Sequence, residues 1–189
     1  MGATTSSTMP KLPVVAKLDL SRYQGLWYEL ARMKDTEFEY GCTWATAKYT
    51  LQPDGTMRLI NTCYAGEQVA TDRFGMERRD GGTARLPDPR YPGRLLVKFD
   101  RFPFFEGEYL VHWTDYDNYA LVGSSNRRYL WLLSRQRPAP RRNIEWLMNW
   151  ARYLGYDPRK LIADPMGFSD QATLKPGQPE PLYYPPGWK

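Results

Sequence analysis

Short runs of alternating apolar and polar residues follow one another from residue 26 to residue 135, separated by turn-forming residues. Successive side chains of a β-strand point to opposite faces, so alternation with a period of two predicts strands with one buried face. Many short strands at close spacing are typical of an all-β fold. We expect eight strands, at residues 26–34, 43–50, 57–63, 69–77, 94–101, 108–113, 118–123 and 129–135.

Turn-forming residues define two of the connections. Pro53-Asp54-Gly55 predicts a tight hairpin, because proline presets φ at the first turn position and glycine tolerates the left-handed one. Asp80-Gly81-Gly82, followed by Pro87, Pro89 and Pro92, predicts a longer loop without ladder pairing.

The pattern changes after residue 135 and again near the end of the chain. Between Pro140 and Gly155 the apolar residues recur with helical spacing, at Ile144, Leu147, Met148, Ala151 and Leu154. This stripe predicts one amphipathic helix. Residues 1–11 carry no periodicity and are expected to form a disordered leader. Residues 166–189 are Pro-rich and are expected to form an extended, mobile tail, although their aromatic residues leave docking open.

Length and composition favour one globular domain. The chain has 189 residues, of which 42% are hydrophobic and 15% aromatic, so a disordered chain is excluded. No apolar run approaches the roughly 18 residues that cross a bilayer, and we expect a soluble protein. The net charge of +5 is spread along the chain. Tandem arginines therefore indicate solvated surface, and no nucleic-acid partner is expected.

The N-terminus lacks the apolar segment of a secretory signal. A cytoplasmic or peripheral membrane location is therefore expected, or a secreted or periplasmic one if a signal was removed. The residues Met1-Gly2-Ala3-Thr4-Thr5-Ser6 fit an acceptor pattern for N-myristoylation at Gly2. A flexible Thr/Ser-rich leader is the plainer interpretation of the same residues.

Candidate catalytic and metal-binding residues are few. His112 is the only histidine, and no Cys or carboxylate stands near it at ligand spacing, so neither a metal site nor a haem is indicated and no cofactor is expected. A Ser-His-Asp set would need the same histidine, and no Gly-x-Ser-x-Gly turn accompanies it. We therefore assign no catalytic residue.

The two cysteines lie at the far ends of the two strands joined by the hairpin at 53–55. Counting back from the turn places Cys42 opposite Cys63 within about two residues, which makes a disulfide geometrically possible. A disulfide needs an oxidising compartment, whereas no secretion signal is visible. We expect a disulfide in the isolated protein, and a reactive thiol is the alternative.

Three segments in order along the chain resemble the motifs of one family. Gly25 and Trp27 lie in Tyr23-Gln24-Gly25-Leu26-Trp27-Tyr28-Glu29-Leu30-Ala31-Arg32, which resembles the first motif of the lipocalins. Thr114-Asp115-Tyr116 and Leu132-Leu133-Ser134-Arg135 match the second and third motifs. The likeness covers residues 12–165. It is greatest to the branch with the bacterial outer-membrane lipocalins, the plant temperature-induced lipocalins and apolipoprotein D.

The resemblance implies an eight-stranded antiparallel up-and-down barrel with the helix packed outside, and a small apolar ligand inside. Strand direction alternates in such a barrel, so Trp27 and Arg135 are expected to meet at its closed base. A guanidinium over an indole would stabilise that end by roughly 1–2 kcal/mol. The opposite end is the mouth, where Phe102, Phe104 and Phe105 are expected to cover the ligand, contact a membrane surface or fold onto the rim.

Alternation also predicts which side chains line the cavity. Charged residues that must face water leave their neighbours inside, namely Ala47, Tyr49, Leu59, Phe74, Val97 and Phe99. The register of the family adds Tyr109, Tyr129 and Trp131, with Ala45, Asn61 and Asp72 as further candidates. Walls of this composition suit a long apolar ligand with one polar end. A closed core with no usable void is the alternative, and the resemblance favours the cavity.

Two functions are compatible with these residues. The first is a lipid-binding lipocalin that carries or sequesters a fatty acid, a lysophospholipid or a similar amphiphile, linked to membrane lipid maintenance or stress. The second is an enzyme on the same barrel, an isomerase or a de-epoxidase that acts on a bound isoprenoid or fatty acyl substrate. That enzyme would depend on a reactive Cys42 or Cys63 or on Asp72.

Overall fold

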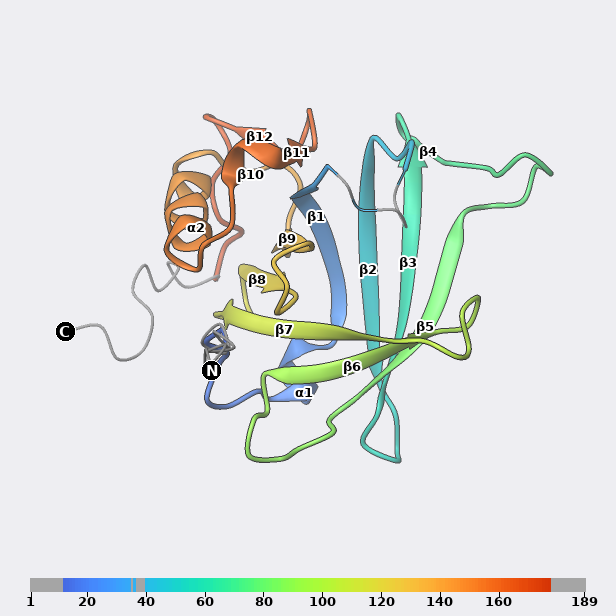
Figure 1. The fold of residues 1–189 in the computed structure, drawn as a ribbon. Helices are drawn as coiled ribbons and strands as arrows, with labels where there is room; N and C mark the ends of the chain where they lie inside the picture. Colours follow the sequence, from blue (N-terminus) through green and yellow to red (C-terminus); the bar gives the residue numbers. More distant parts are fainter. Residues whose placement is uncertain (1–11, 35, 37–39, 178–189) are drawn as a thin grey trace, which may run out of the picture.

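Eight antiparallel strands close into a barrel in the computed structural model, which describes residues 12–34, 36 and 40–177 (Figure 1). Each strand pairs with the next along the barrel, and the last returns to the first. The strands are β1 (Gly25–Met33), β2 (Trp44–Leu51), β3 (Met57–Ala65), β5 (Arg79–Arg85), β6 (Arg94–Phe99), β7 (Glu106–Thr114), β8 (Tyr119–Gly123) and β9 (Leu130–Ser134). The predicted eight-stranded up-and-down barrel is confirmed.

The prediction is wrong for the fourth strand. Residues 69–77 do not form a barrel strand: β4 (Gln68–Val69) is a short extension beside β3, and a turn from Asp72 to Met76 follows it. The barrel strand is β5, which runs through Asp80-Gly81-Gly82, where we expected a loop. A Cβ at Gly82 would lie 2.9 Å from the Lys98 carbonyl oxygen. These glycines therefore permit a close approach of β5 and β6. In the sequence, glycines of this kind cannot be told from glycines that form a turn.

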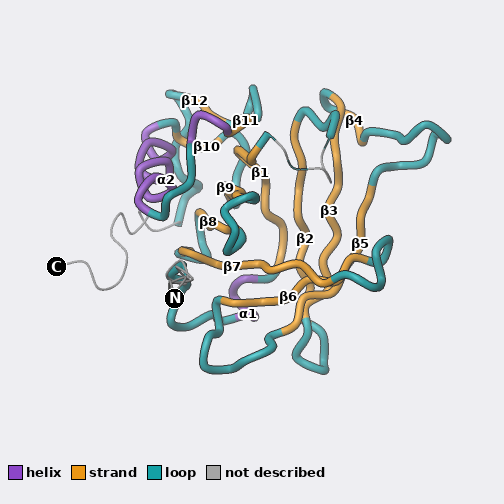
Figure 2. The backbone as a smooth tube through the Cα atoms, viewed as in Figure 1, coloured by secondary structure: helices purple, strands orange, loops and turns teal. Residues whose placement is uncertain are grey.

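Helix α2 (Arg142–Tyr153) lies outside the barrel, as predicted (Figure 2). Its buried residues Leu147 and Ala151, together with Leu154, pack on side chains that point outward from the strands, among them Leu110 and Leu132. This outer cluster is separate from the apolar residues inside the barrel. The barrel therefore has two hydrophobic layers, one on each face of the sheet.

Segments at both ends of the described chain pack on the barrel. Leu12 is buried in the outer cluster, and His112 Nδ1 lies 2.7 Å from the Pro13 carbonyl oxygen. After helix α2 and the short helix η2 (Pro158–Lys160), strand β11 (Leu161–Ala163) pairs with the upper half of β1. Strand β12 (Phe168–Ser169) then pairs with β10 (Ala139–Pro140).

Part of the expected tail is therefore docked. The Gln136 side chain donates a hydrogen bond of 2.9 Å to the Thr173 carbonyl, which ties residues 168–173 to the body. The expectation of a mobile tail from residue 166 differs from the structure here, because backbone pairing and one buried amide hold the segment. The expected leader at 1–11, Gly2 included, and the aromatic residues of 178–189 lie outside the described residues.

The motif residues meet at the closed base. Arg135 lies over Trp27, with its guanidinium carbon 3.6 Å from the ring centroid. The guanidinium donates hydrogen bonds of 2.9–3.1 Å to five backbone carbonyls, those of Arg22, Tyr23, Gln24, Leu26 and Tyr116. These carbonyls belong to the end of helix α1 (Leu20–Tyr23), the start of β1 and the 114–118 turn. One side chain thereby links three segments that are distant in sequence.

Gly25 is required at this base. It has a φ of +100°, and a Cβ there would lie 3.2 Å from Arg135 Nη1. Any other residue would strain the backbone and crowd the guanidinium. The turn of the second motif is built locally: the Asp115 carboxylate accepts hydrogen bonds from the backbone N–H groups of Asn118 and Tyr119.

We predict that Arg135→Lys lowers the free energy of unfolding by about 3 kcal/mol, because lysine keeps the charge but cannot reach several carbonyls at once. Urea denaturation monitored by circular dichroism measures the loss. Arg90→Lys is the matched control, since the Arg90 side chain is 81% exposed, and it should change stability by less than about 0.5 kcal/mol. Equal stability of the two variants would contradict the role given to Arg135.

Candidate ligand-binding cavity

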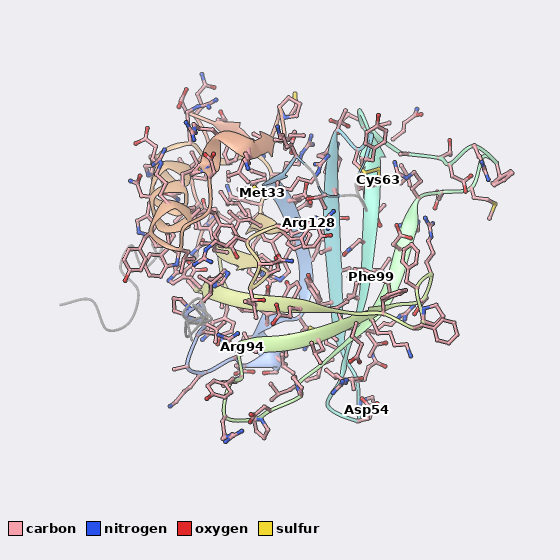
Figure 3. The ribbon with its side chains drawn as sticks, viewed as in Figure 1. Met33, Asp54, Cys63, Arg94, Phe99 and Arg128 are labelled. Carbon is pink, nitrogen blue, oxygen red and sulfur yellow. A yellow bond between two sulfur atoms is a disulfide. The ribbon has the colours of Figure 1, made fainter. Side chains whose placement is uncertain are left out.

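A cavity of about 550 Å³ occupies the upper half of the barrel. The lower half is filled by a second cluster of buried residues, which includes Trp27, Met57, Leu95 and Val111. These side chains close the base, so the cavity opens toward the loops 100–105 and 124–129. Figure 3 labels Asp54 at the base turn and Cys63 near the opposite end of β3, which marks the two ends of the barrel.

Nine of the ten residues predicted to bind the ligand line this cavity. They are Ala47, Tyr49, Leu59, Asn61, Val97, Phe99, Tyr109, Tyr129 and Trp131. Their strands are β2, β3, β6, β7 and β9, with Tyr129 just before β9, and they share the inner face because side chains alternate along each strand. Ala45, a further candidate, also lines it. Period-two alternation alone did not decide between a cavity and a closed core, and the structure contains the cavity.

Phe74 is the exception, and the prediction that it faces the cavity is wrong. It lies in the turn after β4, and 74% of its surface is exposed. Asp72 is also outside the cavity: its carboxylate accepts hydrogen bonds from the backbone of Phe74 and Met76, which lowers its pKa. Both errors have one cause, because the alternation was continued through a turn that only the tertiary structure reveals.

The mouth combines aromatic and polar side chains. Phe102 and Phe105 line the cavity from the 100–105 loop, whereas Phe104 is 94% exposed. The rings of Tyr129 and Trp131 stack 5.7 Å apart on the opposite wall. Glu106, Glu108, Ser124 and Asn126 also line this end. The Arg85 guanidinium holds the pKa of the Glu106 carboxyl below its usual range.

One charged residue of the wall was missed by the sequence analysis. Glu29 lines the cavity and is only 4% exposed. Its Oε1 accepts a hydrogen bond of 2.7 Å from Arg32, and Arg32 also donates one of 2.8 Å to the Cys42 carbonyl. Glu29 stands two residues after the inward-facing Trp27, so period-two alternation places both side chains inside the barrel, and the register shift of β1 comes only after Glu29. In the sequence analysis the alternation was not extended from Trp27 to this charged residue.

Three tyrosine hydroxyl groups meet at the bottom of the cavity. Tyr109 Oη lies 2.8 Å from both Tyr23 Oη and Tyr49 Oη. Burial raises the pKa of Tyr23 and Tyr109 well above the ordinary value, so both phenols keep their protons. Tyr23, on helix α1, was not predicted as part of the site, and its place after an apolar segment gave no signal of this contact.

The two cysteines are joined, as predicted. Cys42 and Cys63 form a disulfide across the mouth ends of β2 and β3, with a Cα–Cα distance of 5.4 Å. Neither sulfur is therefore a free nucleophile in this structure. Within the described ranges, no group of three or more His, Cys, Asp or Glu side chains could hold a metal ion.

An eight-stranded barrel with a plugged base, an open apolar cavity and an external helix is the architecture of a small-ligand-binding β-barrel. The model of the family described as "Lipocalin-like domain" matches residues 18–166. The chain therefore belongs to the lipocalin family.

Several curated relatives resemble the chain over most of its length. The outer membrane lipoprotein Blc of Vibrio cholerae is 34% identical over 150 residues, which cover 78% of this chain and 82% of the relative. Temperature-induced lipocalin-1 of Arabidopsis thaliana is 33% identical over 162 residues, covering 82% and 83%. Apolipoprotein D of Cavia porcellus is 31% identical over 145 residues, covering 73% and 71%. The predicted branch is confirmed.

Solved structures share the fold. Insecticyanin from the tobacco hornworm Manduca sexta aligns with a TM-score of 0.61 at 20% identity, covering 82% of this chain and 84% of that one. Lobster apocrustacyanin A1 aligns with a TM-score of 0.57 at 17% identity, covering 83% and 91%. At this identity the likeness supports the fold alone. Family membership and the apolar cavity together support the binding of a small hydrophobic ligand.

We predict that reduction of the disulfide lowers the free energy of unfolding by about 3 kcal/mol, because the bridge closes a loop of about 20 residues in the unfolded chain. Thermal melts with and without a phosphine reductant measure the effect. A Cys42→Ser, Cys63→Ser variant is the control and should be insensitive to the reductant. Two freely titrating thiols in unfolded, non-reduced protein would contradict the assignment.

Proposed function

We propose that the protein carries or sequesters an amphiphile such as a fatty acid or a lysophospholipid, in the service of membrane lipid maintenance or stress. The observation that carries this proposal is the open cavity of about 550 Å³ with aliphatic and aromatic walls. An acyl chain in the barrel would contact Leu59, Val97 and Trp131, while a polar end would stay at the mouth near Ser124 and Asn126. Carboxylates at the rim favour a neutral, zwitterionic or hydroxyl-bearing headgroup over a polyanion.

The enzymatic alternative has less support. The cysteines that could supply a thiol nucleophile for such an enzyme are joined in the Cys42–Cys63 disulfide. The candidate acid, Asp72, lies on an outer turn. The carboxylates that do line the cavity are paired or accept hydrogen bonds: Glu29 with Arg32, Glu106 with Arg85 and Glu108 with Ser125. A turnover test still separates the two functions. Ligand recovered after long incubation should be unchanged in mass and in double-bond geometry, and an altered product would favour the enzyme.

We predict that the wild type binds palmitic acid or a C16 lysophosphatidylcholine with a dissociation constant in the micromolar range or lower, and that Trp131→Glu abolishes this binding. A carboxylate buried in an apolar wall costs far more than the lost indole contact. Isothermal titration calorimetry measures binding for both proteins, since the variant lacks Trp131, the tryptophan that lines the cavity.

Ile60→Glu is the matched control, because Ile60 adjoins the cavity residues of β3 in sequence but faces outward and is 39% exposed. It adds the same charge to the outside of the barrel and should bind as the wild type does. Binding that survives Trp131→Glu, or that Ile60→Glu removes equally, would contradict the proposed cavity.

We further infer that the mouth rests on a membrane surface. Phe74 and Phe104 project from two mouth loops and are 74% and 94% exposed, and the Arg73 guanidinium lies 4.7 Å over the Phe74 ring. Exposed aromatic side chains beside basic ones suit a lipid interface. Phe102 and Phe105 connect this surface to the cavity. None of the described helices is long and apolar enough to cross a bilayer.

We predict that Phe74→Ser, Phe104→Ser weakens flotation with phosphatidylcholine vesicles that contain phosphatidylglycerol, while binding of palmitic acid is unchanged, because neither residue lines the cavity. Leu86→Ser, Tyr91→Ser is the matched control at the opposite end of the barrel, where these residues are 38% and 42% exposed. It should float as the wild type does. A wild type that never floats would refute the membrane contact.

A myristoyl chain on Gly2 would add to this attachment. One such chain gives only marginal, reversible binding, so a second apolar contact is needed for a stable association. The proposed mouth surface would supply that contact. Loss of flotation on Gly2→Ala, in protein from cells that myristoylate, would support the contribution of Gly2.

A further inference from the structure

The bottom of the cavity is more polar than an acyl tail requires. A saturated chain that enters the barrel would end against the hydroxyl groups of Tyr49 and Tyr109, both of which line the cavity. Tyr49 lies opposite Gly25 of β1 and Leu59 of β3, so this layer stands directly above the closed base. Phenylalanine would fill the same space without a polar atom. The two hydroxyl oxygens therefore indicate that this layer makes polar contacts.

The tyrosine cluster presents polar atoms to the cavity as well as to its own members. A phenolic hydroxyl acts both as a donor and as an acceptor of hydrogen bonds. Tyr109 Oη contacts two other hydroxyl oxygens, of Tyr23 and Tyr49, at 2.8 Å, and Tyr109 lines the cavity, where a ligand oxygen can replace one of these contacts. Tyr109 also keeps its proton, because burial raises its pKa well above the ordinary value. A ligand oxygen that reaches this layer therefore meets neutral hydroxyl groups that are already oriented by each other.

A second polar atom lies one layer nearer the mouth. Asn61 pairs with Ala47, two residues along from the pair of Leu59 with Tyr49, which is about 7 Å in a strand. Its Oδ1 is buried and has no hydrogen-bond partner in the described part of the chain. Asn61 also lines the cavity. An unsatisfied buried acceptor is costly, and a ligand hydroxyl would satisfy it.

We propose that the ligand carries a hydroxyl or carbonyl oxygen on the part of its skeleton that lies deep in the barrel, in addition to any polar group at the mouth. The ligand class is then an oxygenated lipid or terpenoid with polar atoms toward both ends. This inference rests on the proposed function and narrows it. Of the other walls at this depth, Val97, Val122 and Leu133 offer no hydrogen bond. Glu29, which lies opposite Leu133, is paired with Arg32. The tyrosine cluster and Asn61 therefore determine where the oxygen lies.

The experiment compares two probes that differ by one atom, palmitic acid and 16-hydroxyhexadecanoic acid, by isothermal titration calorimetry. In a purely apolar cavity the terminal hydroxyl would weaken binding at least about tenfold, because it loses its water. We expect the wild type to bind the hydroxy acid as tightly as palmitic acid or more tightly. Tyr109→Phe should raise the ratio of the dissociation constant of the hydroxy acid to that of palmitic acid about tenfold.

Tyr49→Phe is a second variant, in case Tyr109→Phe does not fold, and it should shift the ratio in the same direction. Tyr129→Phe at the mouth is the matched control and should leave the ratio unchanged. A wild type that binds palmitic acid but rejects the hydroxy acid tenfold, or a ratio that neither tyrosine substitution moves, would overturn this inference and leave the carrier function standing. Failure of both acids to bind the wild type would overturn the carrier function as well.

Discussion

The closure of the barrel depends on Arg135. Its guanidinium lies on the Trp27 indole and donates to five backbone carbonyls from the end of helix α1, the start of β1 and the 114–118 turn. Burial lowers the pKa of this group by desolvation, yet the surrounding carbonyls and the ring compensate the cation. Because the side chain follows the last barrel strand and holds the first, the seam between β9 and β1 is fastened at the base. Trp27, one of the apolar side chains that close the base, is thereby covered from outside.

The sheet has an apolar layer on each face, and the two layers have different roles. Outward-facing side chains such as Leu110, Leu130 and Leu132 pack under helix α2 and give the barrel most of its external support. Inward-facing ones fill only the lower half, where Trp27, Met57 and Val111 are large and fully buried. Nearer the mouth the inner positions include Ala45, Ala47 and Gly107, which leave space. External packing allows the interior to stay partly empty.

The upper part of the seam between β1 and β2 is held by charges. Strand β1 pairs with β2 only from Gly25 to Tyr28, and β11 pairs with its upper residues. Near this divergence, Arg32 bridges Glu29 and the Cys42 carbonyl. Arg137 lies 3.9 Å over the Trp44 ring and contacts Asp164 at 2.6 Å. Paired charges here provide polar contacts where the two strands no longer form backbone hydrogen bonds.

The sequence by itself determined the barrel, the outer helix, the disulfide and most of the cavity wall. Those features were predicted from local alternation, from helical spacing and from three motifs. Each of these patterns extends over several neighbouring residues. The tertiary structure alone decided that 72–76 is a turn and that Gly81 and Gly82 lie in a strand. It also decided that residues 168–173 dock and that three tyrosines meet. Each of these depends on what another segment places nearby, such as the Lys98 carbonyl beside Gly82, and a side chain's own neighbours in sequence carry no record of such a contact.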